Sequence, residues 1–228
     1  MKPLAPAIVA EFIGTFALCF FGIGAIANVQ MVGLIGIALS HGLALSVFIC
    51  ACMYISGAQF NPAVSIGLIV AGKQTPARAG VFIVAQVIGA VCGTWAIAML
   101  AATTTGIGAI AKAGATSGLL TDMGFVGRVM GFEALCTFAL MVSVLGATVD
   151  DRAHRLGGFV IGLTVTMCIL VAGPYTGASM NPARTLGPAI VGGKWTMWYA
   201  YMIGPIVGAS VAAVVYRLFW VDRWSKPT

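Results

Sequence analysis

The sequence predicts an all-α membrane protein with six transmembrane helices and two re-entrant half-helices, arranged as an inverted repeat. The first observation behind this prediction is composition: of 228 residues, 60% are apolar and only 8% are charged. A soluble domain has about 25% charged residues, so this chain has too little polar surface to cover itself in water. The second observation is that motifs of the first half recur in the second half.

Six apolar runs are long enough to cross a bilayer, which takes about 20 helical residues. They span Ala7–Ala27, Val32–Ile55, Ala79–Ala102, Val129–Val149, Gly157–Val171 and Met197–Leu218. Two shorter runs, Ala63–Ala71 and Ala183–Val191, cannot cross and are predicted to be re-entrant. The first long run contains Glu11 and is long, which favours a retained span over a secretory signal.

The repeat is carried by matching motifs in the same order. A Glu-x-x-x-Thr-Phe motif begins at Glu11 and again at Glu133, and an Asn-Pro-Ala motif recurs as Asn61, Pro62, Ala63 and Asn181, Pro182, Ala183. Each copy holds an odd number of spans, so the second copy must enter the membrane from the opposite face. We therefore expect the two short segments to meet near mid-membrane, within a single domain over 1–228 whose repeats cover 7–102 and 129–219.

We interpret the net charge of +6 as setting the orientation of the chain in the membrane, and not as evidence of a nucleic-acid partner. The side that holds both termini carries Lys2, Lys73, Arg78, Arg152, Arg155, Arg217, Arg223 and Lys226, whereas the other side carries Lys112, Arg128 and Lys194. This excess predicts cytoplasmic termini, with lipid around the spans. No metal or cofactor is expected, because all six cysteines lie inside predicted spans without metal-type spacing.

Each Asn-Pro pair is a helix-start signal, because Asn caps free backbone amides and Pro fits the first helical position. Both half-helices then begin at mid-membrane, where each contributes roughly half a positive charge that repels cations. The extended stretch before each Asn leaves carbonyls without helical partners, and such backbone is tolerated only in protein or along a water-filled path. We expect the pore carbonyls to be those of Gly57, Ala58, Gln59, Gly177, Ala178 and Ser179.

A single Asn-Pro-Ala is usually a loop turn, but two copies in one repeat frame indicate a paired site. The two motifs, the paired Glu11 and Glu133, and Arg184 directly after the second motif resemble the aquaporin (major intrinsic protein) family. The resemblance extends from about Ala10 to Pro205. It implies a passive channel for water and small neutral solutes, not an enzyme, assembled as a homotetramer with one pore in each subunit.

Three ionisable residues inside the predicted spans and half-helices need buried partners. Glu11 and Glu133 are expected to accept amide hydrogen bonds from the irregular stretch of their own repeat, the alternative being a proton relay. Arg184 is expected to be a donor on the pore wall, the alternative being a bridge to a carboxylate.

By the same resemblance, the selectivity filter is expected to comprise His41, Ile169, Ala178 and Arg184. A histidine such as His41 on an apolar helix is otherwise most often a hydrogen-bonded core residue. The set is similar to that of plant tonoplast intrinsic proteins, some of which also pass ammonia, urea or hydrogen peroxide. Thr185, Ala189 and Tyr201 favour a water channel over a glycerol facilitator, while Met202 stands where water channels usually have Trp.

Other function classes fit less well. A secondary transporter also has inverted repeats, but the carboxylates it would need for a coupling ion are already assigned to scaffolding. An ion channel conflicts with a positive centre, and no convincing nucleophile–base pair indicates an enzyme. His154, in the loop Asp150–Arg155, is read as a solvated residue, with a pH gate as the alternative. The stretch Gly106–Leu120 is expected to be a loop of little chemical content, and the short termini favour a prokaryotic cell membrane, with a plant vacuolar membrane as the alternative.

Overall fold

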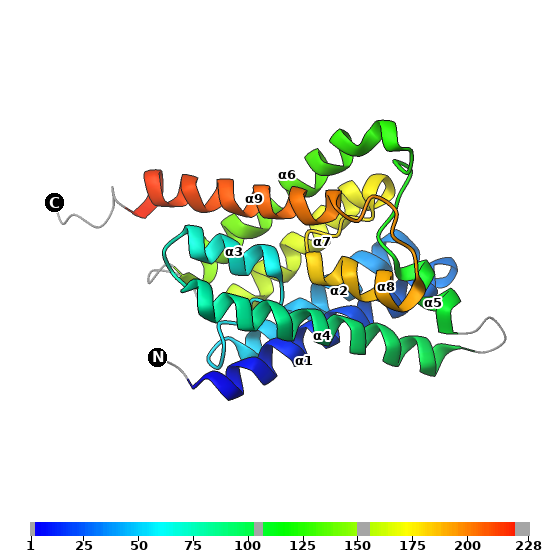
Figure 1. Cartoon of the computed structure of the whole chain (residues 1–228), viewed down its shortest axis with the longest axis horizontal. Coiled ribbons are helices and arrows are strands. Elements are labelled where there is room, and N and C mark those ends of the chain that lie inside the picture. Colours follow the sequence, from blue (N-terminus) through cyan, green and yellow to red (C-terminus); the bar gives the residue numbers. More distant parts are fainter. Residues whose placement is uncertain (1–2, 103–106, 150–155, 222–228) are drawn as a thin grey trace.

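The computed structural model describes residues 3–102, 107–149 and 156–221, and every regular element within these ranges is a helix. Six helices are long and apolar enough to cross a membrane: α1 (Leu4–Ala27), α2 (Val29–Cys52), α4 (Pro76–Ala101), α6 (Val126–Val144), α7 (Gly157–Thr176) and α9 (Ala200–Tyr216). They run along the long axis of the molecule, and α1 begins at the same end at which α9 finishes (Figure 1). The predicted all-α class with six long helices is confirmed.

Two half-helices, α3 (Pro62–Val70) and α8 (Pro182–Gly192), lie among the long helices. Figure 1 shows α3 in the half of the molecule where α1 begins and α8 in the opposite half, so they approach each other from opposite ends. A further short helix, α5 (Ile107–Gly114), packs against α1, α4 and α8. A 3-10 turn (Met123–Phe125) precedes α6, and π-helical turns extend α6 and α9 over Leu145–Val149 and Arg217–Val221.

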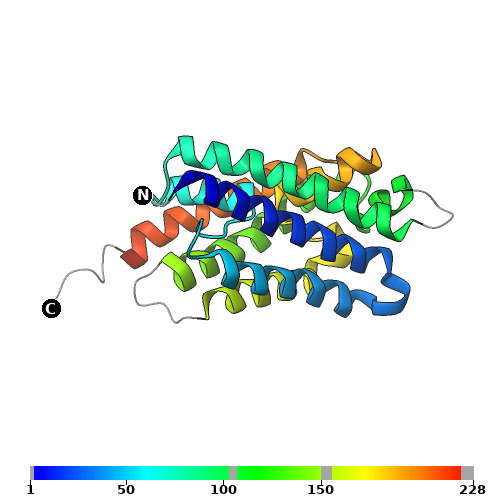
Figure 2. The same cartoon turned by 90° about the horizontal axis from the view of Figure 1, so that it is seen from below.

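The long helices pack in matching pairs, with α1 against α4, α6 against α9, and α2 against α7 (Figure 2). Glycine makes these approaches possible. A Cβ added at Gly89 of α4 would lie 2.4 Å from the carbonyl oxygen of Phe12, and one at Gly208 of α9 would lie 2.0 Å from that of Ala134. Because backbone atoms cannot swing away, only glycine allows the helices to come this close.

Most span boundaries differ from the prediction by a few residues. The second predicted span ends at Cys52 instead of Ile55, and near its start Gly33 adopts a non-helical φ of 61°. The fifth continues past Val171 to Thr176, with Pro174 inside the helix. The N–H groups of Leu119 and Leu120 donate to the carbonyls of Pro174 and Tyr175 at 2.9 and 3.0 Å, so a distant segment satisfies the end of α7.

The segment 106–120 was expected to be a loop of little content, and this was wrong. It contains α5, and its later residues pack on α7 and α8. Ala in this stretch favours a helix, but the Gly residues between the alanines oppose one, so composition alone did not reveal α5. His154 and the rest of its predicted loop lie outside the described residues.

Candidate functional site

Both half-helices begin with the predicted asparagine cap. The Oδ1 atom of Asn61 accepts a hydrogen bond from the backbone N–H of Ala63 at 2.9 Å. The Oδ1 atom of Asn181 accepts from the N–H groups of Ala183 and Arg184 at 3.0 and 3.3 Å. Pro62 and Pro182 occupy the first helical positions, where the missing N–H costs nothing.

The two half-helix starts are tied to each other by a pair of crossed hydrogen bonds. The Nδ2 atom of Asn61 donates to the carbonyl of Met180 at 2.8 Å, and the Nδ2 atom of Asn181 donates to the carbonyl of Phe60, also at 2.8 Å. An amide nitrogen carries two N–H groups, so each asparagine keeps one donor after the crossed bond is made. The bond fixes the direction of that second donor, because it locks the side-chain plane.

Glu11 and Glu133 are fully buried and hold the stretches that precede the caps. Glu11 accepts hydrogen bonds from the N–H groups of Gln59 and Phe60 at 3.0 and 2.8 Å. Glu133 accepts from those of Ser179 and Met180 at 3.0 and 2.7 Å. The hydroxyl of Ser56 or Thr176 completes each set, at 2.6 Å to Glu11 and 2.8 Å to Glu133, and Gln86 donates to Glu11 as well, at 2.8 Å.

These bonds determine which way the carbonyls of the two stretches point. The described backbone has no cis peptide, and in a trans peptide the C=O points opposite to the N–H of the next residue. Since the N–H groups of residues 59, 60, 179 and 180 face the glutamates, the preceding carbonyls face away from them. The N–H groups of Ala58 and Ala178 bond to the hydroxyls that also touch the glutamates, so the carbonyls of Gly57 and Gly177 follow the same direction.

This arrangement requires four residues to adopt a strained backbone conformation. Ala58, Phe60, Ala178 and Met180 have φ values of 50°, 50°, 45° and 53°, in the left-handed region. Such residues cost about 1–3 kcal/mol each and persist only where the surroundings hold them. Charge-assisted bonds to the buried carboxylates, worth roughly 1.5–3 kcal/mol each, are large enough to do so.

Arg184 is the third helical residue of α8, and its guanidinium is almost completely buried. Its Nη1 atom donates to the carbonyl of Gly114 at 3.1 Å and to the hydroxyl of Thr116 at 2.9 Å. Gly114 is the last residue of α5 and Thr116 follows shortly after it, and neither partner is a carboxylate. The Nε and Nη2 hydrogens have no protein partner among the described residues, so they remain available as donors.

Thr116 also connects Arg184 to the rest of the site. Its hydroxyl lies 3.0 Å from that of Thr185, which lies 2.6 Å from the hydroxyl of Ser179. Ser179 in turn donates its N–H to Glu133. Sequence reasoning missed Gly114 and Thr116, and no signal in that Gly/Ala/Thr-rich stretch could have revealed them.

The four filter candidates come from α2, α7, the stretch before α8, and α8 itself, and all are at most 3% exposed. Ile169 and Ala178 belong to one buried apolar cluster. The Nδ1 atom of His41 lies 2.9 Å from the carbonyl oxygen of Ile37. A carbonyl only accepts, so Nδ1 carries the proton.

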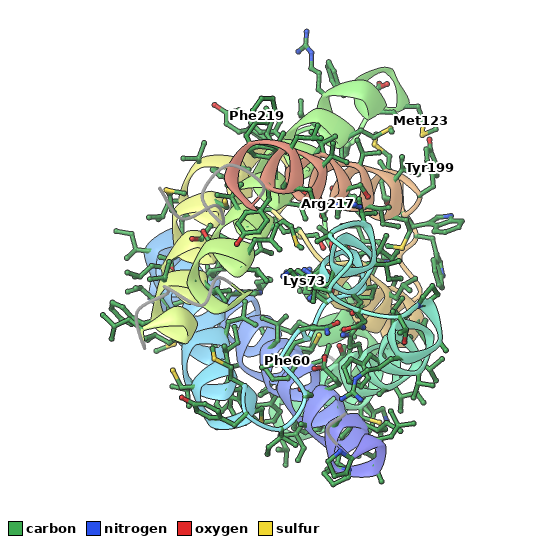
Figure 3. All side chains as sticks on the ribbon, turned by 90° about the vertical axis from the view of Figure 1, so that its left-hand side faces the viewer. Phe60, Lys73, Met123, Tyr199, Arg217 and Phe219 are labelled. Carbon is green, nitrogen blue, oxygen red and sulfur yellow. The ribbon has the colours of Figure 1, made fainter. Side chains whose placement is uncertain are left out.

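A cavity of about 750 Å³ opens on the half of the molecule that contains α3. It reaches from Lys73 and Arg78 at its mouth to Asn61 and Asn181 at its floor, and none of the four filter candidates lines it. Figure 3, viewed from the end where α1 begins, shows Lys73 beside the central opening of the helix ring. The cavity therefore leads from the side of α3 to the asparagine pair.

Comparison with known proteins identifies this arrangement. A family model described as Major intrinsic protein matches residues 2–216. The chain belongs to the major intrinsic protein, or aquaporin, family. Aquaporin TIP4-4 of Zea mays is 37% identical over 97% of this chain and 89% of its own length. A probable NIP-type aquaporin of Nicotiana alata is 36% identical over 92% of this chain and 76% of its own.

A solved aquaporin-family structure shares the fold. The X-ray structure of the aquaglyceroporin from Plasmodium falciparum superposes with a TM-score of 0.82 at 28% identity, covering 95% of this chain and 97% of that one. As an aquaporin, the present protein is an integral multi-pass membrane channel for water and small solutes, and it is not an enzyme.

Proposed function

We propose that this aquaporin is a water channel that excludes protons, ions and glycerol. The observation that carries the proposal is the crossed pair of hydrogen bonds between the half-helix starts. It leaves one fixed amide donor on each of Asn61 and Asn181, next to two positive helix ends. A water that accepts hydrogen bonds from both amides points its own hydrogens outward on both sides, which interrupts proton transfer along the file. Cations meet a positive potential at the same point.

We assign the path on either side of this centre to two kinds of group. Carbonyls of Gly57, Ala58, Gln59, Gly177, Ala178 and Ser179 serve as acceptors, as their direction away from Glu11 and Glu133 supports. His41, Ile169, Ala178 and Arg184 form the filter. Arg184 offers Nε and Nη2 donors there, and the burial of all four side chains supports a narrow passage.

The solute range beyond water follows from His41 and Ile169. A filter that combines a polar ring with an aliphatic side chain suits small neutral solutes, so ammonia, urea and hydrogen peroxide are proposed as further solutes. The likeness to the maize aquaporin TIP4-4 supports this proposal. The alternative is a glycerol facilitator, favoured by Met202 in place of the usual Trp and by the likeness to the aquaglyceroporin from Plasmodium falciparum.

The test is stopped-flow light scattering on proteoliposomes, with empty vesicles as the control. We expect rapid osmotic water flux, no glycerol flux and no proton leak. His41→Ala should admit urea and glycerol more readily, because it widens the filter. Glycerol flux equal to that of water in the wild type would support the facilitator and overturn the filter assignment.

We further propose a homotetramer in lipid, with a pore in each subunit and one channel unit over 1–228, whose halves cover 7–102 and 129–219. The matching pairs α1–α4 and α6–α9 support the two halves. The basic residues near the termini support cytoplasmic N- and C-termini. The aquaporins of Zea mays and Nicotiana alata reported above are plant proteins. They therefore do not support the expected location in a prokaryotic cell membrane.

A further inference from the structure

The ring of His41 points its tip at a glycine of the neighbouring helix. A Cβ added at Gly22 of α1 would lie 2.4 Å from Nε2 of His41 and 2.7 Å from both Cδ2 and Cε1. The ring therefore meets α1 edge-on, in a notch that exists only because residue 22 lacks a side chain. Gly22 is itself buried within α1.

The helices on either side of His41 are packed closely near this contact. The hydroxyl of Ser40 donates to the carbonyl of Phe21 at 2.9 Å, which ties α2 to α1 one residue away from the notch. On the other side, a Cβ at Gly42 would lie 1.9 Å from the hydroxyl oxygen of Thr166 and 2.6 Å from the carbonyl oxygen of Gly162. α2 is thus held against both α1 and α7 at the level of His41.

We propose that Gly22 is a specificity-determining residue: its notch sets how far the His41 ring projects into the pore. This inference rests on the proposed filter. In a Gly22→Ala variant the ring tip must retreat from 2.4 Å to an ordinary contact of at least 3.4 Å, a shift of 1.0 Å. Because the contact with α1 prevents the ring from moving the other way, we expect it to swing toward the proposed lumen. That shift is a large part of the roughly 2.8 Å diameter of a water molecule.

Gly22→Ala should lower osmotic water permeability several-fold and urea permeability more strongly, so that the ratio of urea to water permeability falls. A general loss of stability would not move that ratio. The matched control is Gly24→Ala on the same helix, where an added Cβ meets only the flexible side chain of Ile97 at 3.3 Å. That variant should keep the wild-type ratio.

The decisive comparison adds Gly22→Ala to His41→Ala in proteoliposomes, with channel amount matched by quantitative immunoblotting. With the ring gone, residue 22 has nothing to displace, so the double variant should match His41→Ala. Three results would overturn the role of Gly22. The first is an equal loss of permeability when Gly22→Ala is added to the wild type and to His41→Ala, and the second is a raised urea permeability in Gly22→Ala. The third is an unchanged ratio of urea to water permeability in Gly22→Ala although His41→Ala widens the pore. If His41→Ala itself leaves urea flux unchanged, the proposed filter is wrong, and this inference falls with it.

A folding defect in Gly22→Ala would also test the contact between residue 22 and the His41 ring. If Gly22→Ala alone does not reach the membrane, rescue of its insertion by His41→Ala supports the notch. Failure of that rescue overturns it.

Discussion

The carboxylates of Glu11 and Glu133 hold two non-helical stretches of backbone in place, which neutral side chains could not do as well. Each has two oxygens that accept the N–H groups of the two residues before a capping asparagine, and both are fully buried. A buried carboxylate is costly unless it is paired with donors, and here the donors are backbone amides that would otherwise be unsatisfied. The charge and the strained backbone therefore stabilise each other.

We expect Glu133→Gln to destabilise the protein and reduce water flux. The amide places an NH2 donor where one carboxylate oxygen stands, so the N–H of either Ser179 or Met180 loses its acceptor. The loss should be roughly 1.5–3 kcal/mol for each bond, and it should appear as a lower melting temperature in detergent. Asp122→Asn, at the exposed cap of the 3-10 turn, is the control and should change little. Equal melting temperatures for the two variants would contradict this role.

Arg184 shows how a residue can be predicted while its partners are not. Its position directly after an Asn-Pro-Ala motif predicted a special role, because only function or a buried partner explains a charged side chain at that place. Gly114 and Thr116, which accept its Nη1 hydrogens, lie far away in sequence. They resemble ordinary loop residues, and only the folded chain brings them to the guanidinium.

Thr116→Val should therefore damage the channel although it lies outside every motif. Nη1 of Arg184 would keep only the Gly114 carbonyl, and an unsatisfied buried charged donor costs roughly 1.5–3 kcal/mol. Thermal melting and urea permeability are the measurements, and both should change. Ser117→Ala is the matched control, because that hydroxyl accepts a bond from Lys194 away from Arg184. Wild-type behaviour of Thr116→Val would mean that Gly114 alone holds Arg184.

At the scale of elements, local signals predicted helix starts better than helix ends. Asn61 and Asn181 cap their half-helices as an Asn-Pro pair requires, because capping involves only neighbouring residues. The predicted end of α7 at Val171 was wrong, because the helix continues to Thr176, where the N–H groups of Leu119 and Leu120 satisfy the carbonyls of Pro174 and Tyr175. Such tertiary bonds leave no trace in sequence periodicity.

The pairing of α6 with α9 gives a prediction at this scale. Gly208→Ala places a Cβ 2.0 Å from the carbonyl oxygen of Ala134, so the two helices must separate and the melting temperature should fall markedly. Gly131→Ala in α6 is the control, because a Cβ there meets nothing within 4 Å. That change should be neutral or mildly stabilising, since Ala favours helix over Gly by about 1 kcal/mol. The reverse order of stabilities would contradict the packing argument.

The whole molecule combines two half-channels whose positive helix ends meet at the centre. This arrangement should pass water without passing charge. Proteoliposomes are expected to show fast osmotic shrinkage, yet to hold a pH gradient and a membrane potential as long as empty vesicles do. Arg184→Ala should weaken the barrier and increase the leak of cations. Ion currents through the wild-type protein above the lipid background would refute the electrostatic account.

The cavity on one side of the asparagine pair has a pharmacological consequence. Its volume of about 750 Å³ falls within the range of roughly 300–1,000 Å³ typical of pockets that hold drug-sized molecules. A blocker entering past Lys73 reaches Asn61 and Asn181 directly. One arriving from the opposite end would first meet the proposed filter at Arg184 and His41. Inhibition of this channel should therefore be sided, with the accessible target on the face where the chain begins.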